Sequence, residues 1–172
     1  VTSFDTRPDA FTLDVDANGK TEPLTDGLLI IRHLFGFEGD TLTTNAIGAD
    51  AQRSDGASIE AYLLDHRSLL DVDADGEVGP LTDGLLIIRH LFGFSDDALI
   101  AGVVPVSATR STADSVMDYL GTLIDTDNDG LLDSVDPFPF DNLNGYSELT
   151  DSSWSCADAG RRAVGRGGVG EP

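Results

Sequence analysis

The sequence predicts a mainly α-helical fold with little or no β-structure, built from a duplicated loop–helix unit with long connectors. The first observation is an internal repeat, because Pro23 to Phe37 and Pro80 to Phe94 are identical at all fifteen positions. The second is the helical spacing of apolar residues in the shared stretch GLLIIRHLFGF, which contains a glycine suited to a helix stop. The third is a further match at the same offset of 57 residues, which relates Ile59, Tyr62 and Leu63 to Val116, Tyr119 and Leu120.

These patterns divide the chain into five segments. We expect a lead-in over 1–12, a first repeat over 13–69, a second repeat over 70–124, a further acidic loop over 125–141 and a disordered tail over 142–172. In each repeat a loop precedes the shared helix, which begins near Thr25 or Asp26 and near Thr82 or Asp83. A connector of roughly seventeen residues then leads to a second helix, near 55–69 and 112–123.

The shared helix is apolar almost all round, so something must cover it in an acidic chain. We expect the two copies to pack against each other and against the later helices, or else to leave part of a face exposed for a partner. His33 and His90 stand near the helix ends, where interaction with the helix C-terminus explains them better than transition-metal binding.

The loop before the second copy has acidic residues at alternate positions. Asp71, Asp73 and Asp75 are followed by Gly76, which permits a sharp turn, and Asp83 opens the helix. Side chains at every second position of a curled loop converge, and converging carboxylates repel one another unless a cation lies between them. Oxygen ligands on a flexible loop favour calcium, and the backbone carbonyl of Glu77 is expected to face the ion.

Two other loops share this pattern. The candidate ligands in the first loop are Asp14, Asp16, Asn18, the Lys20 carbonyl, Glu22 and Asp26. Those in the third loop are Asp125, Asp127, Asp129, the Leu131 carbonyl, Asp133 and Asp136. We therefore expect about three calcium ions, the alternative being acidic Asx-turns that bind no ion.

The first two loops differ from the usual twelve-residue loop by one position. The place of the closing ligand falls on Thr25 and Thr82, and the acids Asp26 and Asp83 follow one residue later. Either each loop has an extra residue, or threonine and aspartate share the role. Because aspartate is shorter than the usual closing glutamate, we expect calcium affinity in the weak, extracellular range.

Composition excludes several classes of function. The formal net charge of −21 argues against nucleic-acid binding and against anionic membrane surfaces. No apolar run reaches about eighteen residues, so we expect no membrane span. The single cysteine leaves no disulfide within the chain. No nucleophile–base set, phosphate loop or catalytic metal spacing is visible, and we expect the chain not to be an enzyme.

The two DxDxxG loops, each followed by a helix rich in leucine and isoleucine with an arginine, resemble the duplicated F-hand of type I dockerins. The resemblance covers 13–37 and 70–94 and implies that Asp14, Asp16, Asn18, Asp26, Asp71, Asp73, Asp75 and Asp83 are calcium ligands in EF-hand-like units. It also implies docking onto a cohesin. The third loop, DTDNDGLLDSVDPFPFD, is similar to a thrombospondin type 3 repeat.

We therefore expect a calcium-binding structural or interaction module of a secreted or cell-surface bacterial protein, located outside the cell. The chain begins at Val1 rather than at methionine, which suggests a segment of a larger product. Calcium would stabilise the fold, and the apolar helix pair would serve as core or docking face. Two alternatives stay open: a subunit that self-assembles into an extracellular polymer through its repeats, and a cohesin-binding dockerin of a polysaccharide-degrading enzyme.

Overall fold

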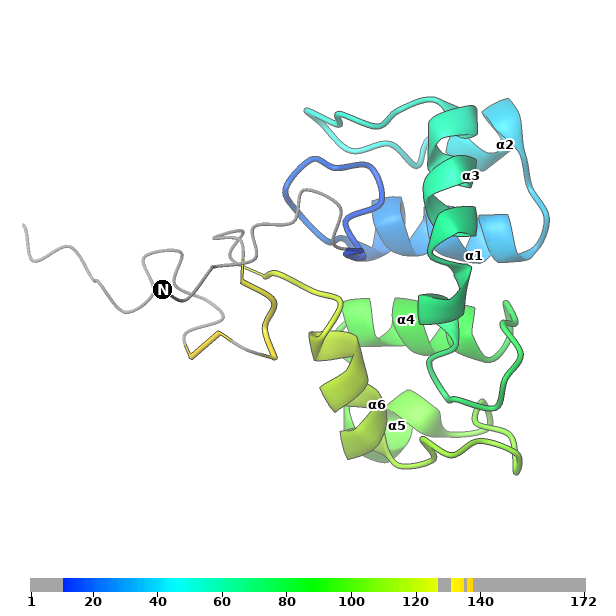
Figure 1. The fold of residues 1–172 in the computed structure, drawn as a ribbon, viewed down its shortest axis with the longest axis vertical. Helices are drawn as coiled ribbons and strands as arrows, with labels where there is room; N and C mark the ends of the chain where they lie inside the picture. Colours follow the sequence, from blue (N-terminus) through cyan, green and yellow to red (C-terminus); the bar gives the residue numbers. More distant parts are fainter. Residues whose placement is uncertain (1–10, 127–130, 135, 138–172) are drawn as a thin grey trace, which may run out of the picture.

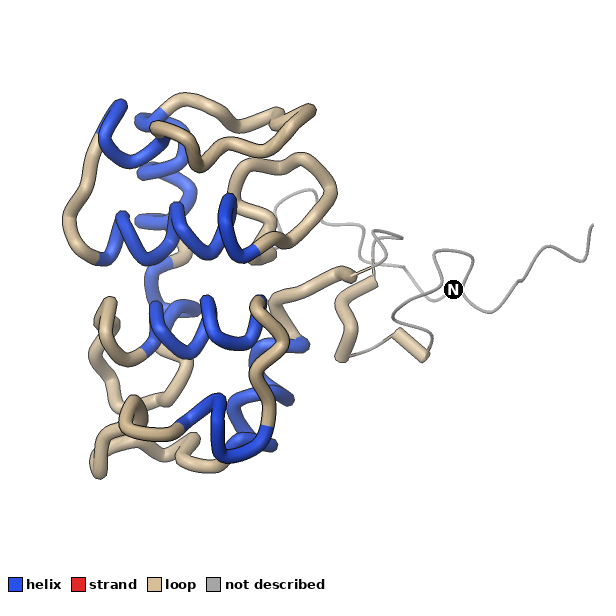
Figure 2. Tube along the Cα trace, turned by 180° about the vertical axis from the view of Figure 1, so that it is seen from behind, coloured by secondary structure: helices blue, strands red, loops and turns tan. Residues whose placement is uncertain are grey.

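The computed structural model describes residues 11–126, 131–134 and 136–137. Most of the predicted lead-in, the candidate ligands Asp127 and Asp129, and the predicted tail lie outside these residues. Across the described residues the chain forms helices, turns and loops but no strand, which confirms the prediction of a mainly α fold. The helices are drawn in Figure 1, and Figure 2 shows the same fold from behind.

Each repeat contributes three α-helices, and two short irregular helical turns lie before α1 and after α3. In chain order they are η1 (Pro23–Gly27), α1 (Leu28–Leu34), α2 (Gly39–Thr43), α3 (Gly56–Asp65), η2 (Arg67–Leu70), α4 (Asp83–Leu91), α5 (Asp96–Ile100) and α6 (Ala113–Gly121). The first repeat thus forms the half of the molecule that contains α1, α2 and α3, and the second forms the half that contains α4, α5 and α6 (Figure 1).

The two duplicated helices, α1 and α4, pack against each other where the halves meet (Figures 1 and 2). Two glycines at the helix starts lie in this contact. An ideal Cβ on Gly27 would lie 3.2 Å from Ile88 Cγ1, and one on Gly84 would lie 3.2 Å from Leu34 Cδ1. The start of each helix therefore faces the end of the other, so the pair is antiparallel. This arrangement confirms that the two copies cover each other.

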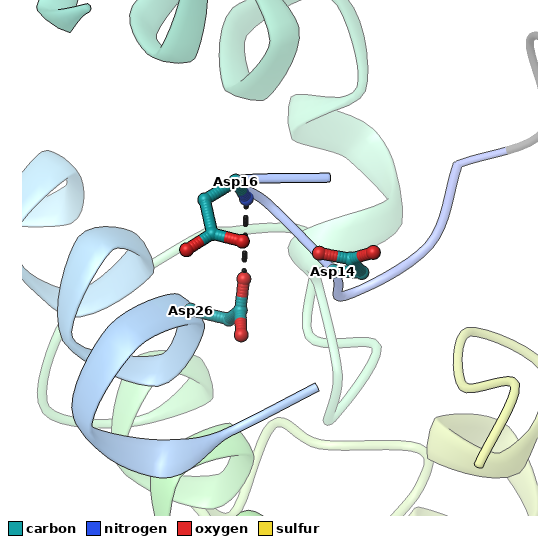
Figure 3. A group of neighbouring side chains, drawn as sticks. All are labelled: Asp14, Asp16 and Asp26. Carbon is teal, nitrogen blue, oxygen red and sulfur yellow. Dashed lines mark hydrogen bonds between the residues drawn. The ribbon is translucent and has the colours of Figure 1, made fainter. Parts of the chain in front are cut away.

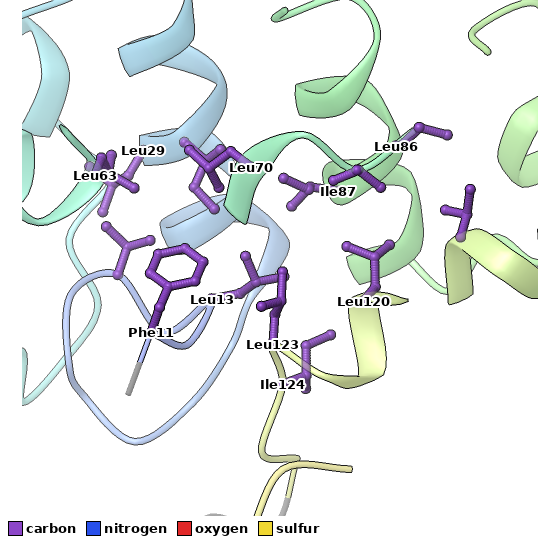
Figure 4. Close-up of a cluster of buried hydrophobic side chains, with 14 of the residues drawn as sticks. Phe11, Leu13, Leu29, Leu63, Leu70, Leu86, Ile87, Leu120, Leu123 and Ile124 are labelled. Carbon is purple, nitrogen blue, oxygen red and sulfur yellow. The ribbon is translucent and has the colours of Figure 1, made fainter. Parts of the chain in front are cut away.

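The core is shared by both repeats. Figure 4 shows Leu13, Leu29 and Leu70 in one apolar cluster with Ile87 and Leu120. The side chains of these five residues are fully buried. A backbone hydrogen bond of 2.7 Å from Leu13 N–H to the Leu123 carbonyl also joins the first loop to the segment after α6. The halves therefore depend on each other for burial of their apolar surface.

The second helix of each repeat lies where the sequence predicts it, and a local cap fixes its start. At α3, the Asp55 carboxylate accepts a hydrogen bond of 3.0 Å from Ser58 N–H. At α6, Thr112 and Ser115 form a capping box in which each side chain binds the other residue's backbone. These side chains accept N–H groups that a helix start leaves without partners. After Asp65 the chain continues as the 3₁₀ turn η2 rather than as an α-helix.

The short helices α2 (Gly39–Thr43) and α5 (Asp96–Ile100) lie in the stretches that the sequence predicts to be loop-like connectors. Their C-terminal carbonyls are held by the arginine of the preceding helix: Arg32 donates to the carbonyls of Leu42 and Thr44 at 2.9 and 2.8 Å. Arg89 donates to those of Leu99 and Ala101, both at 3.0 Å. The arginines thus cap the next helix of the chain. Burial lowers the pKa of His33 and that of His90, which favours the neutral imidazole over a cation at the helix end.

Over the described residues, none of the helices has the length and apolar character that crossing a lipid bilayer requires.

Candidate metal centres

Three aspartates converge in each repeat. Asp14, Asp16 and Asp26 offer carboxylate oxygens that lie within 4.8 Å of one another, and so do Asp71, Asp73 and Asp83. We call these sets the first and second triads. Figure 3 shows the first triad, with the loop residues Asp14 and Asp16 facing Asp26 at the start of the helical segment. Asp16 and Asp26 are fully buried, as are their counterparts in the second triad.

In each triad, the loop backbone curls around the carboxylate of the first aspartate. The Asp14 carboxylate accepts N–H groups from Asn18 at 3.1 Å and Gly19 at 2.8 Å. The Asp71 carboxylate accepts the corresponding groups from Asp75 and Gly76 at 3.2 and 3.1 Å. This curl requires positive φ at the glycine, 84° at Gly19 and 91° at Gly76, which residues with a Cβ rarely adopt. The DxDxxG spacing thus produces the loop that the sequence predicts.

The last aspartate of each triad closes the loop. Asp26 Oδ1 accepts from the N–H groups of Val15 and Asp16 at 2.7 and 3.2 Å, and Asp26 Oδ2 accepts from Glu22 N–H at 2.9 Å. Asp83 makes the same contacts with Val72, Asp73 and Gly79. One carboxylate therefore joins both ends of the loop to the start of the helix.

The extra residue in each loop is absorbed by a wide turn. Gly27 N–H donates to the Glu22 carbonyl and Gly84 N–H to the Gly79 carbonyl, so each bond spans five residues instead of the four of an α-helix. This turn brings Asp26 and Asp83 to the loop centre. Thr25 and Thr82 help to orient these aspartates, because each threonine hydroxyl donates a hydrogen bond to the neighbouring carboxylate at 3.0 Å. Aspartate, and not threonine, is the third member of the triad.

An arginine from the connector holds each loop from outside, a role that the sequence does not reveal. Arg53 NH1 donates to the Val15 carbonyl, and its guanidinium stacks 3.7 Å from the ring centre of Tyr62. Arg110 NH1 donates to the carbonyls of Asp71 and Val72, and its guanidinium lies 3.6 Å from the ring centre of Tyr119. In the sequence, the signal for this contact is that Arg53 and Arg110, like Tyr62 and Tyr119, match at the repeat offset of 57 residues.

The triads concentrate negative charge in a buried place. Burial raises the pKa of Asp26 to about 6. Burial, followed by the nearby charge of Asp83, raises the pKa of Asp73 to about 6, and burial also raises the pKa of Asp16. A cation between the carboxylates would favour their ionised forms and lower these pKa values again.

The other ligands predicted for the first two loops lie outside the triads. The side-chain oxygen of Asn18 accepts from Lys20 N–H, and Asp75 Oδ1 accepts from Glu77 N–H, each at 2.8 Å. Glu22 is exposed, and it contributes its N–H to Asp26. The backbone carbonyls of Lys20 and Glu77 stay predicted ligands.

The described part of the third loop is closed by Asp133. Its carboxylate accepts from Thr126 N–H at 2.8 Å and from the Thr126 hydroxyl at 2.7 Å, and its own N–H donates to the Ile124 carbonyl at 2.8 Å. Asp136 is buried, and its N–H donates to the Leu132 carbonyl. Asp125 and Leu131 belong to the described residues and stay predicted ligands, whereas Asp127 and Asp129 lie outside them.

One atom gives an independent reason to place a cation at the second triad. Asp73 is fully buried, and its Oδ2 accepts no hydrogen bond among the described residues. A buried carboxylate oxygen without a partner costs free energy, on the order of 1–3 kcal/mol or more for a charged group. A cation held by the triad would remove this cost, so the donor set fits a metal ion.

Comparisons with protein-family models, with curated proteins and with solved structures gave no match for this chain.

Proposed function

We propose that this protein is a calcium-binding structural module that presents a protein-docking surface outside the cell. The observation that carries the proposal is the pair of aspartate triads, each with two of its three members buried and each built at the junction of a curled loop with a duplicated helix. In both triads a single carboxylate, that of Asp26 or Asp83, also holds the loop closed. Binding of an ion and stability of the fold are therefore linked.

Charge compensation supports a divalent cation. Each triad carries up to three negative charges with no basic side chain among its hydrogen-bond donors, which are N–H groups and a threonine hydroxyl. Like charges within 4.8 Å of one another destabilise a folded chain in proportion to their burial. Metal binding would then contribute folding free energy directly.

The donor set supports calcium over other divalent ions. All candidate ligand atoms are oxygens, and no cysteine or histidine side chain belongs to either triad. Hard oxygen ligands suit calcium or magnesium, and a flexible loop with several carboxylates and carbonyls suits the larger shell of calcium. The short aspartate closures of the first two loops favour weak affinity, which is useful where calcium is millimolar.

The direct test is a calcium titration of the EDTA-treated protein by calorimetry, with circular dichroism at both end points. We expect two or three ions to bind and the helical signal to rise. Magnesium at the same concentrations serves as the control and should bind more weakly. Absence of heat and of any spectral change up to about 10 mM calcium, above the usual affinity range of such loops, would overturn the proposal.

A duplicated set of exposed apolar side chains supports the docking role. Leu24, Phe35 and Phe37 recur as Leu81, Phe92 and Phe94, and all six are between 47% and 66% exposed. Large apolar side chains that stay exposed in both copies favour a protein partner over an incidental surface. The partner would be a cohesin-like domain or a second copy of this chain.

Light scattering after size exclusion, with calcium and with EDTA, separates these partners. A mass that rises with concentration in calcium and falls in the Phe35→Ser and Phe92→Ser double variant supports self-association. A monomer at all concentrations contradicts the polymer alternative and leaves the docking surface for another protein. The matched control is Leu64→Ser, since Leu64 is exposed but lies on α3, away from the duplicated stretch.

A further inference from the structure

The two triads differ at one contact from the connector. In the first repeat, Gly48 N–H donates to Asp16 Oδ2 at 2.6 Å. At the repeat offset, Gly48 corresponds to Pro105 and Asp16 to Asp73. Proline has no N–H, so it cannot make this bond. Asp73 Oδ2 is correspondingly buried and accepts no hydrogen bond among the described residues.

The two connectors are otherwise placed alike on their loops. Arg53 N–H donates to the Asp16 carbonyl and Arg110 N–H to the Asp73 carbonyl, both at 2.9 Å. The connector of the second repeat makes two further contacts with its loop, from Ser107 to Asp75 Oδ2 at 3.1 Å and from Thr109 to the Ala74 carbonyl at 3.0 Å. Residue 105 therefore belongs to a segment that lies against the second loop, as residue 48 lies against the first.

Gly48 approaches the first loop so closely that a side chain at this position would displace loop side chains. An ideal Cβ at this position would lie 2.2 Å from Asn18 Nδ2 and 2.9 Å from Asp16 Oδ2. A backbone N–H at this distance supplies partial positive charge to the carboxylate and occupies one of its lone pairs. Without an ion, Asp16 Oδ2 of the first triad is thereby partly compensated, whereas Asp73 Oδ2 of the second triad has no such donor among the described residues.

We propose that the second triad is the tighter calcium site of the two, and that the connector residue, Gly48 or Pro105, sets this difference. The inference rests on the proposed calcium-binding function. Side-chain charge also favours higher calcium affinity at the second triad, because Asn18 and Lys20 of the first loop correspond to the acidic Asp75 and Glu77 of the second. The connector thus makes the two halves of a duplicated protein bind calcium over different concentration ranges.

Calorimetric calcium titrations of the full chain test this inference, in a background with Asp127→Asn and Asp129→Asn that removes two charges of the third loop. Two binding steps of unequal affinity are expected. Asp73→Asn should remove the tighter step and Asp16→Asn the weaker one. Asp73→Asn keeps an oxygen to accept from Asp75 N–H, a bond of 3.1 Å to Oδ1, so circular dichroism with calcium should stay close to wild type.

The decisive variant is Pro105→Gly, which supplies both the N–H and the space that the Gly48 contact uses. We expect the tighter step to weaken roughly tenfold, which corresponds to about 1.4 kcal/mol. The control is Pro105→Ala, which restores the N–H but keeps a Cβ, and at the Gly48 position a Cβ would lie 2.9 Å from Asp16 Oδ2. Its affinity should stay within about twofold of wild type, a change of about 0.4 kcal/mol.

Three results would overturn the inference. The first is equal calcium affinity of the two sites, and the second is loss of the weaker binding step in Asp73→Asn. The third is equal weakening of the tighter step in Pro105→Gly and Pro105→Ala, because that result would assign the effect to the loss of proline rigidity. Each of these leaves calcium binding itself intact. Failure of the proposed function would instead appear as absence of both binding steps from the unsubstituted chain.

Discussion

Arg110 shows how one side chain can fix a candidate metal loop without belonging to its aspartate triad. Its guanidinium donates to the carbonyls of Asp71 and Val72 while its face stacks on Tyr119. The Tyr119 hydroxyl in turn donates to the Leu69 carbonyl at 2.8 Å, just before the loop. The loop backbone is therefore fixed from the connector and from α6 together.

We predict that Arg110→Ala lowers the free energy of unfolding by about 2–3 kcal/mol in calcium, because two carbonyls lose a charged donor and the ring loses its cation. Arg110→Lys should recover only part of this, since an ammonium cannot reproduce the planar fork of the guanidinium. Urea unfolding followed by circular dichroism measures both changes. Arg67→Ala is the control, because Arg67 makes one exposed bond of 3.2 Å to the Val78 carbonyl. An Arg110→Ala effect no larger than that of Arg67→Ala would contradict the role of Arg110.

The raised carboxylate pKa values predict an unusual pH dependence in the absence of metal. Asp26 and Asp73 have a pKa of about 6 in the folded chain against 3.8 ordinarily, so the folded state binds more protons than the unfolded state between these values. Stability contributed by these groups therefore falls as pH rises from about 4 to 6. We expect the metal-free protein to melt at a higher temperature at pH 5 than at pH 7.

In saturating calcium the direction should reverse, because protons then compete with the ion for the same carboxylates. Thermal melts followed by circular dichroism at pH 5, 6 and 7, with EDTA and with calcium, measure both slopes. Asp73→Asn should flatten the slope in EDTA, since it removes one of the titrating groups. A metal-free protein that loses stability steadily on acidification would contradict the assignment of raised pKa values to the triads.

Among the elements, the contact of α1 with α4 places the two duplicated loops. Because the pair is antiparallel and each loop precedes its helix, the triads lie toward opposite ends of the pair. The close approach depends on Gly27 and Gly84, whose missing side chains leave space for Ile88 and Leu91 and for Ile31 and Leu34. Identical sequences thus form a self-complementary contact within one chain.

We predict that Gly84→Val destabilises the protein by about 1–3 kcal/mol, because the added methyl groups would overpack the contact with Leu34 and Ile31. Gly121→Ala is the matched helical control. A Cβ there would lie 3.9 Å from Ser134 N, an ordinary van der Waals contact, so this variant should be neutral or gain up to about 1 kcal/mol in helix propensity. Urea midpoints of both variants in calcium provide the measurement, and a neutral Gly84→Val would show that the helices do not meet closely.

The sequence predicts the long elements well and the short ones poorly. Apolar spacing and the internal identity are local signals, so α1, α4 and the second helices α3 and α6 could be placed from them. The five-residue helices α2 and α5 have no such spacing, and they are completed by Arg32 and Arg89, which belong to another element. These helices depend on contacts with an arginine of the preceding helix, and a local sequence pattern does not show such contacts.

The residues of the candidate site were likewise only partly predictable from the sequence. The alternation of Asp14 and Asp16, and of Asp71 and Asp73, predicts the curled loops. The choice of Asp26 over Thr25 could not be made from spacing, because it depends on the five-residue span of the turn that precedes α1. The Gly48 contact with Asp16 joins residues 32 positions apart, and nothing near Gly48 in the sequence marks it.

At the scale of the whole molecule, the shared core makes the two candidate metal sites interdependent. Leu13 and Leu70, each directly before a candidate metal loop, are fully buried in the same cluster as Ile87 and Leu120. Loss of order in one loop would therefore expose apolar surface that the other repeat covers. The protein should unfold as one cooperative unit although its sequence is a tandem repeat.

Hydrogen exchange measured by mass spectrometry tests this cooperativity. The identical sequences of α1 and α4 give indistinguishable peptides, so α3 and α6 serve as the reporters of the first and second repeats. We predict that removal of calcium with EDTA lowers the protection of both helices by a similar factor, and that Asp73→Asn in calcium lowers the protection of α3 as well as α6. If α3 keeps its protection while α6 loses it, the repeats unfold independently, and each triad stabilises only its own half of the chain.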